Sequence, residues 1–421
     1  MRYILLPLYL LIFFGAFIVL RGRTSHLKLV ISLPDLYLIA FFFYTFLPII
    51  DCYIGNKRLE AADTLLFKSV IVLACLFIGI LAGEKIDFIT PWRKKQLSGA
   101  SDNYQWLKTF MWGLFCFGCV AVNVILLRGG VFAMMSASYR DSYVEANNNI
   151  GALNYCVMPY ALIFTDKEIV TDKKARIVAL LFCSIITVLF FLGGNRNLAV
   201  MVVLAVIWSR FKYREFNLLG TFLLMMLAVI VLGYIAVFRE YGISNIINGS
   251  ANLNWANART YSLSFANGEL GTMLNFEEIR SRIIPSFHFP FGLGYSYFIL
   301  PIINLVPKSL WPGKPLAYAD YFSQNAFGTF DGIGYGFSPI YEAEVNYGSL
   351  WWMAFIGIGM LLISSRRKTS QNQLLNMGIM ACIILNLFRI DFATCFKFYA
   401  MMWVFKTAYL MTLKVRFIEA E

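Results

Sequence analysis

The chain has 421 residues, of which 59% are hydrophobic and only 14% are charged, and its mean hydropathy is +0.66. Soluble globular domains contain about 25% charged residues, so this composition excludes an ordinary water-soluble protein. The net charge is +12, and only two histidines are present, His26 and His288, which excludes chemistry that depends on a histidine cluster.

Apolar runs recur along the chain and predict membrane-spanning helices, since a helix needs about 20 apolar residues to cross a bilayer. The first run is followed by Arg21-Gly22-Arg23 rather than by a small-residue cleavage site, so we expect it to be retained. The sequence thus predicts an all-α polytopic integral membrane protein with about 11 (10 to 13) transmembrane helices. The predicted spans are 3–20, 29–50, 66–83, 107–127, 150–165, 176–193, 197–209, 217–238, 339–363, 373–390 and 397–414.

The connectors between these spans alternate in charge. Basic connectors are 21–28, 84–108, 166–176, 209–216, 364–372 and the C-terminus, whereas 51–68, 128–149, 239–338 and 389–397 balance acids and bases. Because Lys and Arg accumulate in cytoplasmic loops, the first set is expected to face the cytoplasm, with the C-terminus, and the second set the outside. The pI of about 9.2 therefore reflects the orientation of the chain in a membrane rather than nucleic-acid binding.

This arrangement of spans and connectors divides the chain into three regions. We expect an N-terminal bundle of about 8 spans over 1–238, a large extracytoplasmic loop over 239–338, and about 3 spans with a short cytoplasmic tail over 339–421. Within the loop, "NFEEIRSRIIP" (275–285) resembles a short amphipathic helix. "FGLGYSYFILPIINLV" (291–306) is short and interrupted by Pro301, which favours a re-entrant or surface-lying segment over a full span.

Arg196 stands in the turn "GGNR" (193–196), between two apolar runs on the outer side. The two glycines let a ligand approach the backbone, and the following helix offers free N–H groups at its N-terminus. An arginine at such a point suits a phosphate, so we interpret it as an anion clamp; the alternative is an anchor in the headgroup layer. Arg239 emerges on the same side and either ends the eighth span or shares the anion.

The loop supplies further candidate binding residues. Arg280 and Arg282 lie two residues apart and so face different sides of a helix; an alternative role for one of them is an ion pair with Glu277 or Glu278. The remaining candidates are two cations and two aromatic side chains of the same loop: Lys308, Lys314, Trp311 and Tyr321.

Two carboxylates stand at the start of the ninth span. Ser338-Pro339 is typical of an N-cap followed by the first helical residue, and Glu342 lies in the first turns, where the helix dipole favours an acid. Glu344 lies further into the span. One interpretation is a well-capped helix start; we favour a role for one of the two carboxylates as a general base, because charge at membrane depth is costly.

The stretches "GGNR", "VPKSLWPGKP" (306–315) and "GFSPIYEAEVNYGSLWW" (336–352), in this order around a large outer loop, resemble the O-antigen and capsule polymerases of the Wzy type. The similarity extends over about 190–365, and the first half of the chain matches only in being hydrophobic. The resemblance implies a GT-C-like architecture and a metal-independent, inverting glycosyltransferase without a cofactor. Its substrates would be undecaprenyl-pyrophosphate-linked repeat units, and a separate membrane protein would regulate chain length.

By the same resemblance, Arg196 and then Arg239 would hold the pyrophosphate, and Glu342 or Glu344 would activate or orient the acceptor hydroxyl. An O-antigen ligase is the first alternative, with His288 as its histidine. A lipid-linked oligosaccharide flippase or other transporter is the second, although the charges gather on one face and no internal repeat is found. A membrane O-acyltransferase would need a histidine within a span, and none of the predicted spans contains one.

Overall fold

The computed structural model describes residues 2–24, 33–83, 95–98, 104–128, 149–192, 195–211, 269–283, 292–307, 310–327, 337–364, 371–413 and 416–419. These residues are helical apart from turns, short connections and one pair of short strands. The chain forms two compact units. The first comprises Met1–Trp92, Ser264–Lys368 and Ile384–Lys397; the second comprises Arg93–Leu263, Thr369–Ile383 and Phe398–Glu421.

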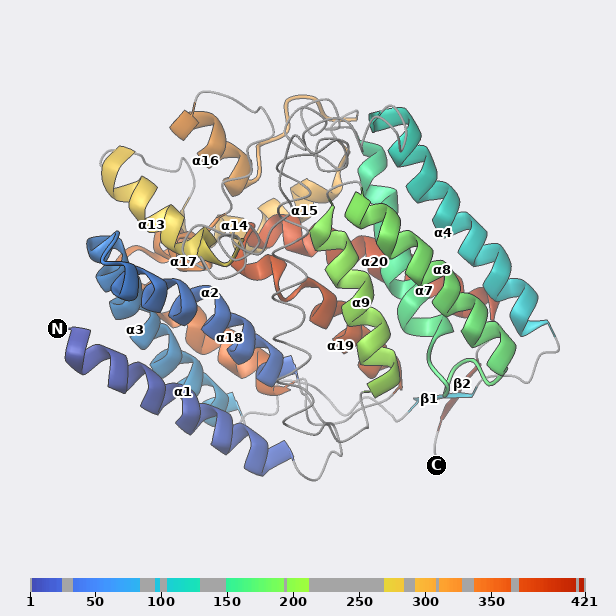
Figure 1. The fold of residues 1–421 in the computed structure, drawn as a ribbon, viewed down its shortest axis with the longest axis horizontal. Coiled ribbons are helices and arrows are strands. Elements are labelled where there is room, and N and C mark those ends of the chain that lie inside the picture. Colours follow the sequence, from blue (N-terminus) through green and yellow to red (C-terminus); the bar gives the residue numbers. More distant parts are fainter. Residues whose placement is uncertain are drawn as a thin grey trace, which may run out of the picture. The chain divides into compact units, whose positions relative to one another are not determined.

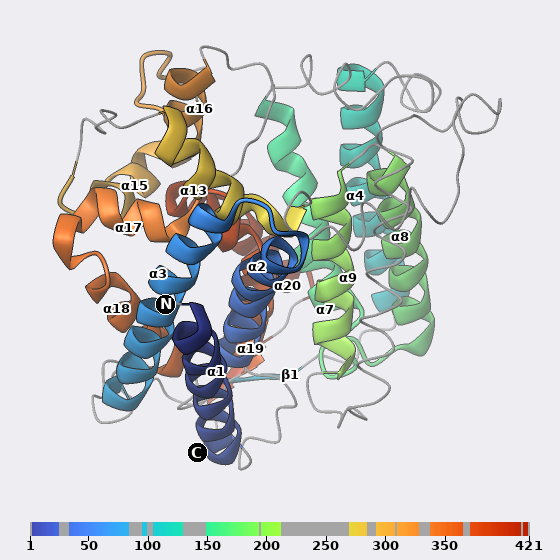
Figure 2. The same ribbon diagram turned by 60° about the vertical axis from the view of Figure 1, so that its left-hand side comes forward.

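In the first unit, α3 (Leu59–Gly83) is a central helix. It packs against α1 (Arg2–Thr24), α2 (Leu33–Gly55) and α18 (Met353–Ser364), and Figures 1 and 2 show it alongside α1 and α18. Two glycines allow the contact with α18: a Cβ on Gly79 would lie 2.2 Å from the Ile356 carbonyl oxygen, and one on Gly359 would lie 2.5 Å from that of Leu76. Close backbone approach through small residues is a common way for membrane helices to associate.

The same unit contains shorter helices from the segment predicted as an outer loop. They are η3 (Glu269–Gly271), α13 (Thr272–Ile283), α14 (Tyr295–Phe298), α15 (Leu300–Leu305) and α16 (Tyr318–Phe327), followed by α17 (Pro339–Tyr347), η4 (Gly348–Leu350) and η5 (Asn386–Phe388). The helices α13, α15, α16 and α17 contribute to a buried, largely aromatic cluster, which Phe337 and the start of α20 (Phe392–Thr412) complete. Its members are Phe276, Leu300, Tyr318, Phe322, Phe337, Tyr341 and Ala393. This part of the loop is therefore packed onto α17.

The second unit contains β1 (Lys95–Ser98), α4 (Gln105–Arg128), η2 (Asn149–Cys156), α7 (Val157–Phe164), α8 (Lys173–Leu192), α9 (Arg196–Phe211), α19 (Gln371–Ile383), α20 (Phe392–Thr412, whose first residues belong to the first unit) and β2 (Arg416–Glu419). The two strands pair antiparallel, with Lys95 opposite Glu419. Polar side chains tie the helices together: Trp208 Nε1 donates to the Leu374 carbonyl at 3.2 Å, and the Tyr409 hydroxyl donates to that of Cys156 at 3.0 Å.

The prediction of a helical membrane protein is confirmed in its coarse form. Among the described residues, five helices are long and apolar enough to cross a membrane: Arg2–Leu20, Leu33–Gly55, Leu59–Gly83, Gln105–Asn123 and Lys173–Phe191. The predicted spans at 150–165, 197–209 and 373–390 correspond to shorter apolar helices, and α20 covers the predicted span 397–414 as far as Thr412. The predicted span 217–238 lies outside the described residues. The total of about 11 spans and the GT-C-like architecture remain predictions.

The predicted span 339–363 is not one continuous helix. It is divided into α17 and α18, whose axes meet at 119°, and a joined pair of this kind is either a broken span or a re-entrant loop. The division follows Gly348, which has φ +56, a conformation that side-chain-bearing residues rarely adopt. A second difference is that α3 begins at Leu59 rather than near residue 66, so Lys68 lies inside a helix instead of at its edge.

Candidate functional site

The candidate site is built around α17. As predicted, Ser338 is its N-cap residue, Pro339 occupies the first turn and Glu342 is the acid of that turn. Residues two apart on a helix point about 200° away from each other. Glu342 and Glu344 therefore enter two different networks.

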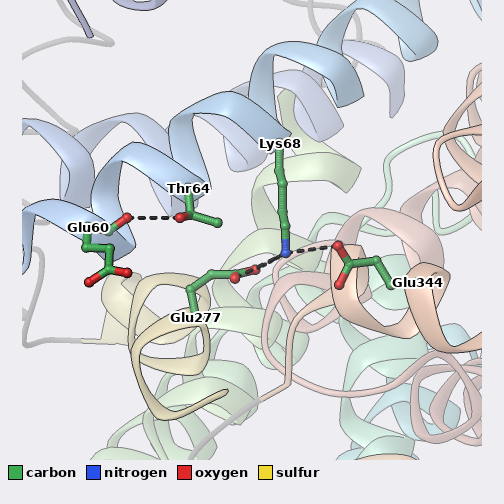
Figure 3. Close-up of polar contacts among 5 residues, drawn as sticks. All are labelled: Glu60, Thr64, Lys68, Glu277 and Glu344. Atoms are coloured by element: carbon green, nitrogen blue, oxygen red, sulfur yellow. Dashed lines mark hydrogen bonds and ion pairs between the residues drawn. The ribbon is translucent and has the colours of Figure 1, made fainter. Parts of the chain in front are cut away.

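Glu344 belongs to a charged cluster with Lys68 and Glu277, which we call the Lys68 cluster (Figure 3). The Lys68 ammonium lies 2.9 Å from Glu344 Oε1 and donates to both carboxylate oxygens of Glu277, at 3.0 and 3.1 Å. The side chains of Lys68, Glu277 and Glu344 are 11%, 3% and 15% exposed. One ammonium thus joins α3, α13 and α17. Removing one partner of such a buried pair costs about 3–5 kcal/mol.

A second ion pair fixes α13 near the start of α3. Arg58 Nε lies 2.8 Å from Glu278 Oε2, and Arg58 Nη1 donates to Asn275 Oδ1. Glu277 and Glu278 are thus both paired with cations of the α2–α3 segment. The side chains of Arg280 and Arg282 lie outside the described residues, so the alternative that one of them pairs within α13 remains a prediction.

Glu342 is held in a network of its own and is 2% exposed. The Ser296 hydroxyl donates to Glu342 Oε1 at 2.6 Å, and the Phe392 N–H donates to Oε2 at 3.0 Å. Asn346 Nδ2 donates to the Ser296 hydroxyl and to the Glu342 carbonyl, both at 2.7 Å. Both carboxylate oxygens therefore bind donors that fix α14, α17 and the start of α20 to one another.

Asp391 lies beside this network, immediately before α20. Its Oδ1 accepts the Thr394 N–H at 2.9 Å and its Oδ2 accepts the Ala319 N–H at 3.2 Å, so it caps the helix. Burial raises the pKa of Asp391 above its ordinary value of 3.8. Free N–H groups and the positive end of the dipole at the α20 N-terminus stabilise the two neighbouring carboxylates, Asp391 and Glu342.

The segment before α16 offers aromatic and apolar surface. Trp311 is 43% exposed, and Phe298 and Ile302 are 68% and 66% exposed. Lys314 is turned onto its own segment, where its ammonium donates to the Val306 carbonyl at 2.8 Å. Tyr321 on α16 is half-buried. As predicted, α14 and α15 are too short to span a membrane, and their exposed apolar side chains suit contact with lipid or a lipid substrate.

The candidate cations are only partly described. α8 ends at Leu192, α9 begins at Arg196, and the Asn195 N–H donates to the Phe190 carbonyl at 2.8 Å, so the two predicted helices on either side of the glycines are confirmed. Gly193, Gly194 and the Arg196 side chain lie outside the described residues. Arg239 and Lys308 also lie outside them. Of the predicted site residues in the described part of the first unit, Glu344 enters the Lys68 cluster, whereas Glu342 and Lys314 make separate contacts.

Sequence analysis missed three polar residues that the structure places here: Lys68, Ser296 and Asn346. The available signal for Lys68 was a lysine in the apolar run "LLFKSVIVLACLFIGI", counted as part of a loop. Ser296 and Asn346 carry no charge, and their role depends on which segments meet.

In the part of the chain that is described, no group of three or more His, Cys, Asp or Glu side chains is arranged to hold a metal ion. Comparison of the chain with protein-family models, with curated proteins and with solved structures found no match.

Proposed function

We propose that the protein is a membrane glycosyltransferase that polymerises undecaprenyl-pyrophosphate-linked oligosaccharide repeat units into a surface polysaccharide at the outer face of the inner membrane. The observation that carries the proposal is the position of Glu344. Its carboxylate lies on the first arm of a bent helix pair and contacts the Lys68 ammonium in a largely buried cluster. The resemblance of the three sequence stretches supplies the reaction class.

In the proposed reaction, Glu344 takes the proton from the acceptor hydroxyl. The acceptor oxygen bonds to C1 of the donor sugar, with inversion, as the bond from C1 to the pyrophosphate oxygen breaks. Cations stabilise the charge that develops on the leaving pyrophosphate, and the resemblance alone assigns this role to Arg196 and Arg239. The reaction as proposed requires neither a metal nor a cofactor.

Glu344 is a better candidate base than Glu342 on two observations. Both oxygens of Glu342 accept hydrogen bonds from Ser296 and from the backbone, and the residue is 2% exposed. The Glu344 carboxylate contacts the Lys68 ammonium through Oε1, and its Oε2 is buried, so the 15% exposure belongs to the side chain as a whole. We favour Glu344 because a contact with a flexible lysine side chain can rearrange when substrate binds, whereas Glu342 Oε2 is held by the backbone N–H of Phe392.

Exposed apolar side chains fit this substrate class. A polyprenyl carrier approaches through the membrane, and the side chains of Phe298 on α14, Ile299 between the helices and Ile302 on α15 offer a surface for it. Aromatic rings such as Trp311 suit a sugar, because they present a flat apolar face.

The proposal is tested by plasmid complementation of the source strain lacking this gene, with its surface polysaccharide separated on a gel. Loss of the gene is expected to leave single-repeat product. Arg196→Ala and Glu344→Gln should fail to restore the ladder, and Arg196→Lys should restore little, because a lysine cannot bind a phosphate in the forked geometry of a guanidinium. Glu278→Gln, which alters the neighbouring ion pair, is the matched control and should give full ladders.

One observation favours a second candidate, a lipid-linked oligosaccharide flippase. Transporters often bind substrate where a membrane helix is broken, as α17 and α18 are at 119°. In that case loss of the gene would leave no repeat units on the cell surface. Polymer that is made but not attached to lipid would instead indicate a ligase.

A further inference from the structure

We propose that Lys68 is a positioning residue whose ammonium orients the Glu344 carboxylate for proton abstraction. This inference rests on the proposed function. Lys68 itself gives and takes no proton: the proton passes from the acceptor hydroxyl to Glu344 as the new glycosidic bond forms and the pyrophosphate leaves with the bonding electron pair.

The location of Lys68 is the first argument. It is inside α3, one of the helices long and apolar enough to span a membrane, and the residue is 9% exposed. A charged side chain at such a place costs several kcal/mol unless it is paired, so its presence points to a role. Its ammonium is directed at Glu344 and Glu277.

The rigidity of α3 is the second argument. Near its middle α3 binds α17 through Lys68, and one face of its C-terminal half packs on α18 through Gly79. Eleven residues separate the two contacts, which is about 16 Å along a helix. The same straight helix therefore contacts both arms of the 119° bend and fixes the angle at which α17 presents Glu344.

The third argument is the link to α13. The Lys68 ammonium also binds Glu277 of α13, the helix that contains the candidate phosphate-binding residues Arg280 and Arg282. The Lys68 side chain thus links the base-carrying helix to an arginine-carrying helix. Positioning of this kind matters because a displacement of about 1 Å can lower a rate on the order of 100-fold.

Purified protein in liposomes, supplied with lipid-linked repeat units isolated from the deletion strain, provides the test. Lys68→Met should lower kcat about 100-fold while KM changes about twofold or less, and Lys68→Arg should recover most of kcat. Arg58→Met, which removes the other ion pair onto α13 and leaves the Glu344 contact in place, should keep kcat close to wild type. Equal losses in Lys68→Met and Arg58→Met, or a Lys68→Met variant with normal kcat, would overturn the proposal.

A second readout does not depend on polymerisation. Hydrophobic carbodiimides modify carboxyl groups that are protonated in an apolar setting, and peptide mapping assigns the modified residue. Glu344 should be modified faster in Lys68→Met than in wild type and unchanged in Arg58→Met; equal modification in all three refutes the Lys68 contact. Wild-type protein that makes no polymer in liposomes refutes the proposed function, while the modification rates still report on Lys68.

Discussion

The two carboxylates of α17 should give opposite phenotypes when each is replaced by glutamine. In Glu342→Gln one carboxylate oxygen becomes an NH₂ group, in a site where the Ser296 hydroxyl and the Phe392 N–H both donate. One of these donors then loses its acceptor. Leaving a buried donor without its acceptor costs about 1–3 kcal/mol, so we expect Glu342→Gln to be destabilised by about 2 kcal/mol and to retain activity when folded.

In Glu344→Gln the Lys68 ammonium remains paired with the Glu277 carboxylate, 3.0 Å away. The amide oxygen of the new glutamine can accept the hydrogen bond that Glu344 accepted from Lys68. No buried charge is left unpaired, so the stability cost should be about 1 kcal/mol or less. Activity should fall about 100-fold or more, the usual contribution of a general base.

The eight free cysteines provide the assay, since seven of them are buried and only Cys119 is partly accessible. Unfolding in detergent exposes these thiols to a fluorogenic maleimide, and the midpoint temperature is read directly. Glycosyl transfer is measured on the same preparations. A Glu342→Gln protein with wild-type stability and no activity would refute the reasoning, because Glu342 rather than Glu344 would then be the base.

Three further substitutions test the packing of the first unit, each by the same thiol assay. Gly79→Val should prevent normal folding, because a Cβ would lie 2.2 Å from the Ile356 carbonyl oxygen; a stable protein would contradict the α3–α18 contact. Phe276→Ala should lower the free energy of unfolding by about 3–5 kcal/mol, because it leaves a cavity in the aromatic cluster. A loss under about 1 kcal/mol would contradict the burial of Phe276 in this cluster. Since burial raises the pKa of Asp391 in the folded state, its protonation stabilises the fold at low pH, and this is lost as pH rises through the folded pKa. Wild type should therefore lose stability relative to Asp391→Asn as pH rises from about 4. If the stability of the two proteins changes with pH in the same way, the prediction is wrong.

Local sequence signals predicted the local features of the site well. Ser338-Pro339 indicated where α17 begins, and the polar–apolar pattern of 275–285 indicated α13. Both depend on residues within a few positions of each other, where capping and periodicity act.

The features that depend on distant segments were not predicted. The Lys68–Glu277 contact joins residues 209 apart in the chain, and no periodicity within α3 or α13 indicates it. The break after Gly348 was also missed, because the apolar composition of 339–363 continues across it and a window average is insensitive to a single glycine. Fold class thus follows from composition, whereas the partners of a buried charge follow from tertiary packing.

The arrangement of α17 explains why two acids so close in sequence can serve different purposes. Since they face nearly opposite directions, Glu342 points to Ser296 and the start of α20, while Glu344 points to Lys68. In the first network, the uncharged donors Ser296 and the Phe392 N–H bind both oxygens of Glu342 and hold α17 in place. The second is centred on the Lys68 ammonium, which pairs with the carboxylates of Glu344 and Glu277. A helix fixed on one face can present a charged group on the other with little freedom, which is what a base requires.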